Sequence, residues 1–427
     1  MSDSGSDTGS DRGRRDQLVQ SQYEAYPYPE RKPADEKKRL LAGSPSQLAE
    51  VNHYVFGGRR DLSKPLAALV AGGGTGDAAI MLAQQMTDAG VPGEVVHLDQ
   101  SEPAQTIAQE RAKVRGLDNI RFVQGSLLDV ADIAPGPWDY IDCCGVLHHL
   151  EDPDAGLAAL ASVLAPDGGL GVMVYGALGR TGIYHVQDMM RTLAPPGDDD
   201  KARVALTRRL VNDLPATAWL NCNGLVRDHK DGGDPGLYDI FLHARDRAYQ
   251  VPEVANLVAG AGLRLVTFIE PYRYDPLLLV HDPQLKKALV DFDPLERAAF
   301  AELYLGNHKK HVFYAVRAAN AVVPPSPDTP DAVPTLVGLT PEEATQQMPP
   351  GGKITVSTEG HKQVMQVPSL SRAIVALCDG QRDLAAIHGA IQEKRGDLDY
   401  DAFKMQFDQL YGVMNAINRM VLRLPID

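Results

Sequence analysis

The chain has 427 residues, which is enough for two or three domains with cores of their own. Acidic residues outnumber basic ones by 56 to 42, so the net charge of −14 argues against nucleic acid or an anionic membrane as a partner. The four cysteines lack CxxC spacing and no segment has about 18 continuous apolar residues, which predicts a cytoplasmic protein with reduced thiols.

The N-terminal part divides into a tail and a possible cover for a cleft. Residues 1–18 are rich in Ser, Gly and Asp, which predicts a disordered tail. Residues 19–65 are interpreted as an N-terminal lid and helices, with an amphipathic helix at 46–56. Tyr26 and Tyr28 alternate with prolines in an extended segment, so they either contact substrate as part of a lid or only dock the tail.

Short apolar runs then alternate with helical patterns over residues 66–318. Strands are predicted at 67–71, 94–98, 120–124, 140–144, 170–175, 263–270 and 311–317. Because helices separate them, the pattern predicts an α/β domain with a doubly wound, mostly parallel seven-strand sheet and an antiparallel seventh strand. Residues 177–247 interrupt the pattern and are predicted to form a helical insertion over the substrate mouth.

Residues 319–334 are a proline-rich linker, and residues 335–427 are predicted to form a small C-terminal helical module. A strand is expected at 353–358 and helices near 369–378, 382–395 and 400–418, an arrangement that resembles a winged helix. This module holds nine Lys and Arg against eleven Asp and Glu, which favours protein docking or formation of a homodimer over DNA binding.

The segment LVAGGGTGDAAI, residues 69–80, leads the first strand into a helix through glycines. Such a turn offers free backbone N–H groups and lets a ligand approach without meeting Cβ atoms. Gly72, Gly74 and Gly76 give GxGxG spacing, with Asp77 where a dinucleotide-binding GxGxxG has its third glycine. Because an acidic residue there repels phosphate, the turn indicates a nucleoside ligand without one.

A second ligand signal is Asp99, which ends the second strand and is placed to accept both hydroxyl hydrogens of a ribose. NAD-binding proteins share this feature, so residues 138–176, WDYIDCCGVLHHLEDPDAGLAALASVLAPDGGLGVMVYG, decide between the ligands. They resemble class I S-adenosylmethionine-dependent methyltransferases, in which "fD" begins strand four, a "vLhHl.dp" loop faces the substrate and a "vLkPgG" turn precedes strand five. The resemblance is continuous over 66–176 and weaker over 250–318, and it implies methyl transfer with S-adenosyl-L-methionine as cofactor.

The resemblance also implies which residues contact the cofactor. The loop under the methionine part consists of Gly72, Gly74 and Gly76, and the ribose contacts are Asp99 and Gln100. The adenine contacts are Ser126 and Leu127, and the strand-four residue near the sulfonium is Cys143. The Cys143–Cys144 pair is expected to pack within the strand rather than to act as nucleophiles. Two positions depart from the family: Ala71 stands where many members have an acidic residue, and Ser126 where many have Asp.

His148 and His149 lie on the loop after strand four, where the acceptor atom is expected. Either could act as a general base, since histidine titrates near neutral pH, or brace the loop through hydrogen bonds. Some relatives bind magnesium through two glutamates in this loop. Gly145 and His148 occupy those places here, so no metal site is predicted.

Arg245 and Arg247 precede the helix that leads to strand six, beside the expected substrate mouth. They either pair with a carboxylate or phosphate of the acceptor or form a salt-bridged loop.

The sequence therefore predicts a methyltransferase that acts on a small-molecule or protein acceptor. Protein-lysine methylation, suggested by the tail module, and a non-catalytic scaffold that binds S-adenosylmethionine remain alternatives.

Overall fold

The computed structural model describes residues 29–196, 199–227, 230 and 233–426. The tail predicted at 1–18 lies outside the described residues, and so do Tyr26 and Tyr28, whose predicted substrate contact stays a prediction. Within the described residues, no helix is both long and apolar enough to cross a membrane.

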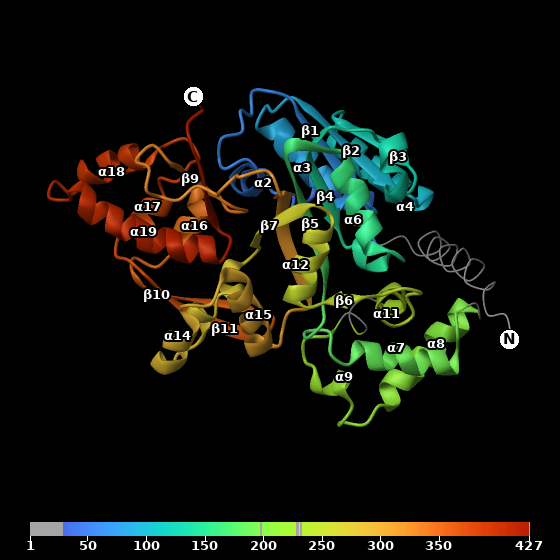
Figure 1. Cartoon of the computed structure of the whole chain (residues 1–427). Coiled ribbons are helices and arrows are strands. Elements are labelled where there is room, and N and C mark those ends of the chain that lie inside the picture. The colour runs from blue at the N-terminus through green and yellow to red at the C-terminus, as the bar shows by residue number, and fades with distance from the viewer. Residues whose placement is uncertain (1–28, 197–198, 228–229, 231–232, 427) are drawn as a thin grey trace.

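A central sheet with the strand order β3-β2-β1-β4-β5-β8-β7 organises the chain (Figure 1). Its strands are β1 (Leu66–Ala71), β2 (Gly93–Asp99), β3 (Ile120–Gln124), β4 (Trp138–Cys144), β5 (Leu164–Gly176), β7 (Leu263–Phe268) and β8 (Lys310–Arg317). Strands β1 to β5 pair in parallel, and β8 runs antiparallel between β5 and β7. The predicted doubly wound sheet with an antiparallel last strand is confirmed. The structure adds β6 (Ala248–Tyr249), which pairs with the end of β5.

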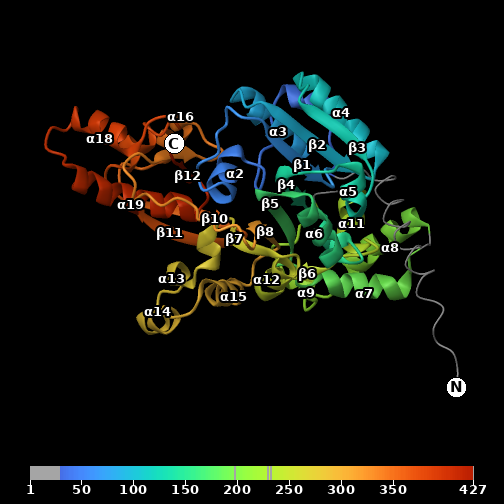
Figure 2. The same ribbon diagram turned by 45° about the horizontal axis from the view of Figure 1, so that its top comes forward.

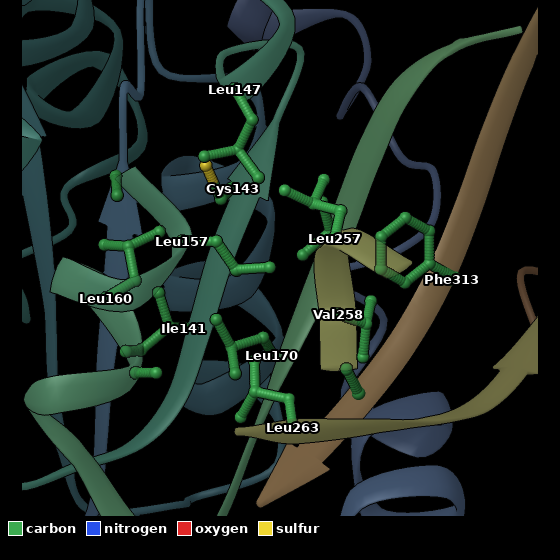
Figure 3. Packing of buried hydrophobic residues seen from close by; sticks show 14 of the residues in the cluster. Ile141, Cys143, Leu147, Leu157, Leu160, Leu170, Leu257, Val258, Leu263 and Phe313 are labelled. Carbon is green, nitrogen blue, oxygen red and sulfur yellow. The ribbon is translucent and has the colours of Figure 1, made fainter. Parts of the chain in front are cut away.

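Helices cover both faces of the sheet because the buried strands alternate their side chains between two apolar clusters. One cluster joins the sheet to α6 (Pro153–Ser162), α12 (Val251–Gly260) and α15 (Pro294–Leu305). The other joins it to α2 (Leu48–Val55) and α3 (Asp77–Asp88). On the β3 side the sheet is flanked by α4 (Glu102–Arg115), whose first turn is capped by the Ser101 hydroxyl. Figure 3 shows the first cluster between β4, β5 and the helices α6 and α12.

Within the described residues, helices joined by turns and loops make up the segment 177–247, which is predicted as an insertion. It contains α7 (Ile183–Leu193), α8 (Asp200–Asp213), α9 (Trp219–Cys222) and α11 (Gly233–Phe241), which enclose an apolar cluster of their own. In Figure 1 these helices lie together in green, below the sheet. β6 then carries the chain back beside β5, so the insertion leaves and rejoins the sheet at the same strand end.

The C-terminal module contains the expected helices and more strands than the sequence indicated. Its elements are β9 (Val333–Leu336), α16 (Pro341–Gln347), β10 (Gly352–Thr358), β11 (His361–Val367), α17 (Ser371–Val375), α18 (Leu384–Gln392), α19 (Tyr400–Ala416) and β12 (Met420–Arg423). β10 and β11 form an antiparallel hairpin, and β12 pairs with β9. β9 begins inside the predicted linker, and the domain boundary at 319–334 stays a prediction.

Helix α2 connects this module to the sheet, and both views show it between them (Figures 1 and 2). The ring Nδ1 of His53 lies 2.8 Å from the carbonyl oxygen of Leu422 in β12. The Asn418 amide donates to the buried Glu50 carboxylate at 2.8 Å. The module is thus attached to α2 through buried polar contacts as well as apolar packing.

Candidate functional site

The turn from β1 into α3 needs glycine for two reasons. Gly72, Gly74 and Gly76 have φ values of 73°, 51° and 99°, in the left-handed region that other residues avoid. A Cβ on Gly72 would lie 2.4 Å from the Val146 side chain, and a Cβ on Gly73 would lie 2.4 Å from the His97 ring. The loop is therefore held tightly between the β4 loop and β2.

Four backbone N–H groups of this loop, those of its glycines, are bonded within the protein, contrary to the expectation that they are free. Those of Gly72 and Gly73 donate to the Leu98 carbonyl, at 2.8 and 3.0 Å. The Gly74 N–H donates to Asp99 Oδ2 at 2.7 Å, and the Gly76 N–H donates to the Gly73 carbonyl at 2.9 Å. These four amides are therefore not available to a diphosphate, whose binding to such a loop depends on free N–H groups.

A cavity of about 620 Å³ opens above this loop at the carboxyl ends of the strands. That volume lies within the range of roughly 300–1,000 Å³ that is usual for small-molecule sites. One end is lined by Gly72, Gly73, Gly74, Asp99, Gln100, Ser101, Gly125 and Leu127. The other end is lined by Cys144, His149, Met173, Tyr175, Arg180, Asp239, Lys309, Lys310 and Glu359. The cavity thus extends from β3 across β1 and β4 to the start of β8.

Most of the predicted cofactor residues line this cavity. Gly72, Gly74, Asp99, Gln100 and Leu127 do so. Asp99 also accepts from the backbone N–H of Ser101 at 2.8 Å, so its carboxylate joins the glycine loop to the start of α4.

Three predicted cofactor residues are not among those that line the cavity. Gly76 is the N-cap of α3, and a Cβ on it would lie 2.8 Å from the Ala108 side chain of α4. The Ser126 hydroxyl accepts from the backbone N–H of Leu128. Cys143 is fully buried in the apolar cluster, as Figure 3 shows, while Cys144 lines the cavity. The alternation of side chains along β4 explains this correction for Cys143.

The end of strand one, where many relatives carry an acidic residue, also differs from the expectation. Ala71, the position expected for it, packs in the core cluster, and Val70 is the residue that lines the cavity. Asp142 of β4 is paired with Val70 in the strand register and lines the cavity beside it. Burial raises the pKa of Asp142 to about 6, although its carboxylate accepts from the Ser46 hydroxyl at 2.6 Å.

A network of charges fixes the N-terminal segment against the glycine loop. Asp77, which lines the cavity, pairs with Arg31 and Arg111, both at 2.7 Å. Arg111 is buried and also pairs with Glu36 at 2.6 Å. The Thr75 hydroxyl donates to the carbonyl of Pro29, which lines the cavity. The segment that begins at residue 29 therefore lies against the edge of the cavity, where the lid was expected.

At the far end of the cavity an arginine is held rigidly against an aromatic ring. The Arg180 guanidinium lies 3.7 Å from the centre of the Tyr175 ring and pairs with Asp246 at 2.7 Å. The Asp246 carboxylate also accepts from the Gln187 amide at 2.9 Å. Tyr175 and Arg180 thus form a fixed wall that the sequence analysis did not identify.

The two histidines predicted as candidate bases have different surroundings. His149 lines the cavity, and its Nδ1 lies 2.8 Å from the Arg245 carbonyl, which places the ring proton on Nδ1. His148 is 1% exposed and is not among the cavity residues; its ring packs 3.9 Å from that of Tyr175. Burial lowers the pKa of both rings, so both are neutral at neutral pH. Direct contact with an acceptor is open to His149, and His148 supports the wall.

The two arginines predicted to contact substrate do not line the cavity. The Arg245 side chain pairs with Glu151, and the Arg247 side chain lies over the Tyr249 ring and near Glu253. The alternative interpretation, a salt-bridged loop, describes this geometry better. Among the described residues, no group of three His, Cys, Asp or Glu side chains could hold a metal ion.

The cavity residues that were not predicted differ in how clearly the sequence marks them. Asp142 interrupts an apolar strand run, YIDCC, so a buried functional carboxylate could have been suspected there. Arg180 and Glu359 lie in segments without any motif, and Glu359 comes from the turn of the β10–β11 hairpin, about 180 residues away in sequence. Only the fold brings them to the cavity.

Comparisons with known proteins agree with this geometry. Residues 69–170 match the family model described as "Methyltransferase domain". An uncharacterised protein of Synechococcus is 35% identical over 265 residues, which are 61% of each chain. The tRNA 5-carboxymethoxyuridine methyltransferase of Escherichia coli is 34% identical over 154 residues, 33% of this chain and 57% of that protein. The alignments thus span less than two thirds of the length of either relative.

Among solved structures, PKMT2 from Rickettsia typhi in complex with AdoHcy superposes with a TM-score of 0.61 at 14% identity. The superposition covers 90% of this chain and 76% of that one, so it includes most of the C-terminal module. At this identity the likeness concerns the fold.

Proposed function

We propose that this chain, which carries a class I S-adenosylmethionine-dependent methyltransferase domain, transfers a methyl group from S-adenosyl-L-methionine to a small-molecule or protein acceptor. The observation that carries the proposal is the glycine loop. The amides of its four glycines are bonded within the protein, and three carboxylates, those of Asp77, Asp99 and Asp142, line the cavity around it. Asp99 suits a ribose and Asp142 suits a cationic group, while the bonded glycine amides are not available to a diphosphate.

S-adenosylmethionine, when bound, supplies a methyl group that is already activated on a sulfonium. The chain's own residues therefore need to hold the ribose, exclude water and present the acceptor in line. Asp99 and Gln100 are the proposed ribose contacts, and Leu127 is the proposed adenine contact.

The acceptor is proposed to lie between Tyr175, Arg180 and His149, at the end of the cavity away from Asp99. With its proton on Nδ1, His149 carries a lone pair on Nε2. It is the proposed general base where the acceptor has a proton to lose. An acceptor that is already ionised needs no base, so the pH profile of the reaction depends on which acceptor is used.

The first test is ligand binding by isothermal titration calorimetry. The wild-type protein is expected to bind AdoHcy with micromolar affinity and NAD not at all. Asp99→Asn is expected to weaken AdoHcy about tenfold or more, since hydrogen bonds to a charged group contribute roughly 1.5–3 kcal/mol. Glu94→Gln, at the opposite end of the same strand, is the matched control. Preferential binding of NAD would overturn the proposal.

The second test identifies the acceptor. The protein is incubated with S-adenosylmethionine labelled on the methyl group and with an extract of its host, and the label is followed into protein, RNA and small-molecule fractions. Label in protein or metabolites is expected. Label in RNA would overturn the proposed acceptor class, which the charge of −14 supports. Binding of AdoHcy without any transfer would favour the scaffold alternative.

Protein-lysine methylation is the second candidate, because the C-terminal module reaches the cavity. Glu359 in the turn between β10 and β11 lines the acceptor end and pairs with Arg273. An acidic side chain at that place would attract a lysine, although Lys309 and Lys310 nearby would repel it. Label that runs only with small molecules would remove this candidate.

A further inference from the structure

Asp142 is an acidic residue in a strand that is otherwise apolar or aromatic around it. Its side chain is on the same face of β4 as Tyr140, which packs in the cluster of α2 and α3, and the residue is 1% exposed. It nevertheless lines the cavity, between Val70 and Cys144. A carboxylate in such a place costs stability unless a cation or several donors compensate for the lost water.

The order of the strands assigns a part of the ligand to this place. The cavity passes from Leu127 after β3, over Asp99 at the end of β2, and over the glycine loop at the end of β1, to Asp142 on β4. With adenine at Leu127 and ribose at Asp99, the aminocarboxyl end of the cofactor extends beyond the glycine loop. It therefore arrives at β1 and β4.

The other two carboxylates around the loop are already engaged. Asp77 is compensated by Arg31 and Arg111, and Asp99 accepts from two backbone N–H groups. Asp142 accepts from the Ser46 hydroxyl, the backbone N–H of Cys144 also stabilises its charge, and it makes no ion pair with any described residue. An ionised carboxylate has about four acceptor sites, so it can take a further donor from the cavity.

We infer that Asp142 binds the α-ammonium group of S-adenosylmethionine and takes over the task of the acidic residue that the end of β1 lacks. The register supports this exchange directly, because Val70, the cavity-facing residue at the end of β1, is opposite Asp142 on the neighbouring strand. The carboxylate is thus on the strand next to β1 and lines the same cavity as Val70. The inference rests on the proposed function and names a residue of that same site.

The cost of this arrangement fits a binding role. Burial raises the pKa of Asp142, so the ligand-free protein holds the ionised form at a loss of stability. An ammonium group bound in the cavity would stabilise the ionised carboxylate, and this stabilisation would contribute to the binding free energy. A purely structural role needs no charge, because a neutral amide could accept from Ser46 equally well.

The test uses two ligands that differ only at the amino group: AdoHcy and its deaminated analogue, which keeps the carboxylate. Affinities are measured by calorimetry for wild type, for Asp142→Asn, and for the control Glu94→Gln, a carboxylate that is not among the cavity residues. Wild type and Glu94→Gln are expected to prefer AdoHcy by about tenfold or more, as for a charge-assisted pair. Asp142→Asn is expected to reduce this preference to less than about twofold, since the residue and the ligand group are coupled.

The ratio of the two affinities separates the role from a general disturbance of the site. A loss of affinity by the same factor for both ligands in Asp142→Asn, or a wild type without preference, would overturn the inference while the proposed function stands. A wild type that binds neither ligand would instead overturn the proposed function, and the inference with it. Because the wild-type preference is measured directly, one half of the test does not depend on how any variant folds.

Discussion

The Arg180 guanidinium and the Asp246 carboxylate are joined at 2.7 Å, and the Asp246 side chain has no exposed surface. Arg180 brings a positive charge to the cavity, while Asp246 lies behind it and fixes its direction. Two ions that are removed from water depend on each other, because either one alone would be a buried, unpaired charge.

Removal of this arginine should therefore be costly. Arg180→Met is expected to lower the free energy of unfolding by about 3 kcal/mol, since it leaves Asp246 buried without its cation. Arg191→Met breaks the exposed pair with Asp188 and should cost less than about 1 kcal/mol. Urea denaturation of both variants measures the difference, and equal losses would show that Asp246 is solvated in solution.

The Gly73 position should not tolerate a side chain. A Cβ there would lie 2.4 Å from the His97 ring, so Gly73→Ala should lower stability by about 1–3 kcal/mol through overpacking. It should also weaken AdoHcy. Gly43→Ala is the control, because no atom lies within 4 Å of its Cβ. The double variant Gly73→Ala, His97→Ala should regain part of the loss in thermal unfolding; a double variant worse than the sum of both singles would contradict the steric explanation.

Asp142 should make the ligand-free protein less stable as the pH rises. Its pKa is about 6 in the folded protein against an ordinary 3.8, so the folded state binds the proton more tightly than the unfolded state. Stability from this group is present below pH 4 and is lost between pH 4 and 6. The free energy of unfolding of Asp142→Asn should be about 3 kcal/mol higher than that of wild type at pH 7, since the pKa is raised by about two units. At pH 4 the two free energies should be equal.

Chemical denaturation at pH 4, 5 and 7 checks this expectation. The groups near Asp142 are the Ser46 hydroxyl and, on its own strand, Tyr140, Cys143 and Cys144. Burial raises the pKa of these three strand residues, so they stay neutral across this range. Denaturation curves for wild type and variant that remain parallel at all three pH values would show that Asp142 does not titrate as expected.

His53 lies at the contact between α2 and β12, and the stability that it contributes should depend on pH in the opposite direction. Burial lowers its pKa from 6.5 to about 4, so the unfolded state takes up the proton first. Stability from this group is present above pH 6.5 and is lost as the pH falls toward 4. His53→Gln keeps a donor for the Leu422 carbonyl but cannot titrate, and its stability relative to wild type should rise by about 3 kcal/mol over that interval. Denaturation at pH 4.5 and 7 measures this change, and a constant difference would contradict it.

Much of the fold was predictable from local patterns. The apolar runs at 67–71, 94–98 and 140–144 became β1, β2 and β4, because a parallel strand buried on both faces needs a continuous apolar segment. The hairpin strand β11 was not predicted, since HKQVMQV is a short and mostly polar stretch. The first two residues of β9, Val333 and Pro334, were assigned to the proline-rich linker, because a strand of four residues is too short to show a period.

The candidate site was predictable only where a motif fixes the backbone. Gly72, Gly74 and Asp99 were found because the turn and the strand end dictate where they lie. Cys143 was misplaced by one residue, and a shift of one residue along a strand turns a side chain to the opposite face. For Arg245 the sequence left a substrate contact and a salt-bridged loop open, because its partner Glu151 lies on a different segment.

By itself the sequence determined a doubly wound sheet, a glycine turn that disfavours phosphate and a strand-end carboxylate, since each depends on neighbours within a few residues. The tertiary structure alone decided that Asp142 stands opposite Val70, that Asp246 holds Arg180 against Tyr175, and that Glu359 of the C-terminal module reaches the cavity. Those relationships join segments that are far apart in the chain. No local preference encodes them, because they follow from the packing of whole elements around a common core.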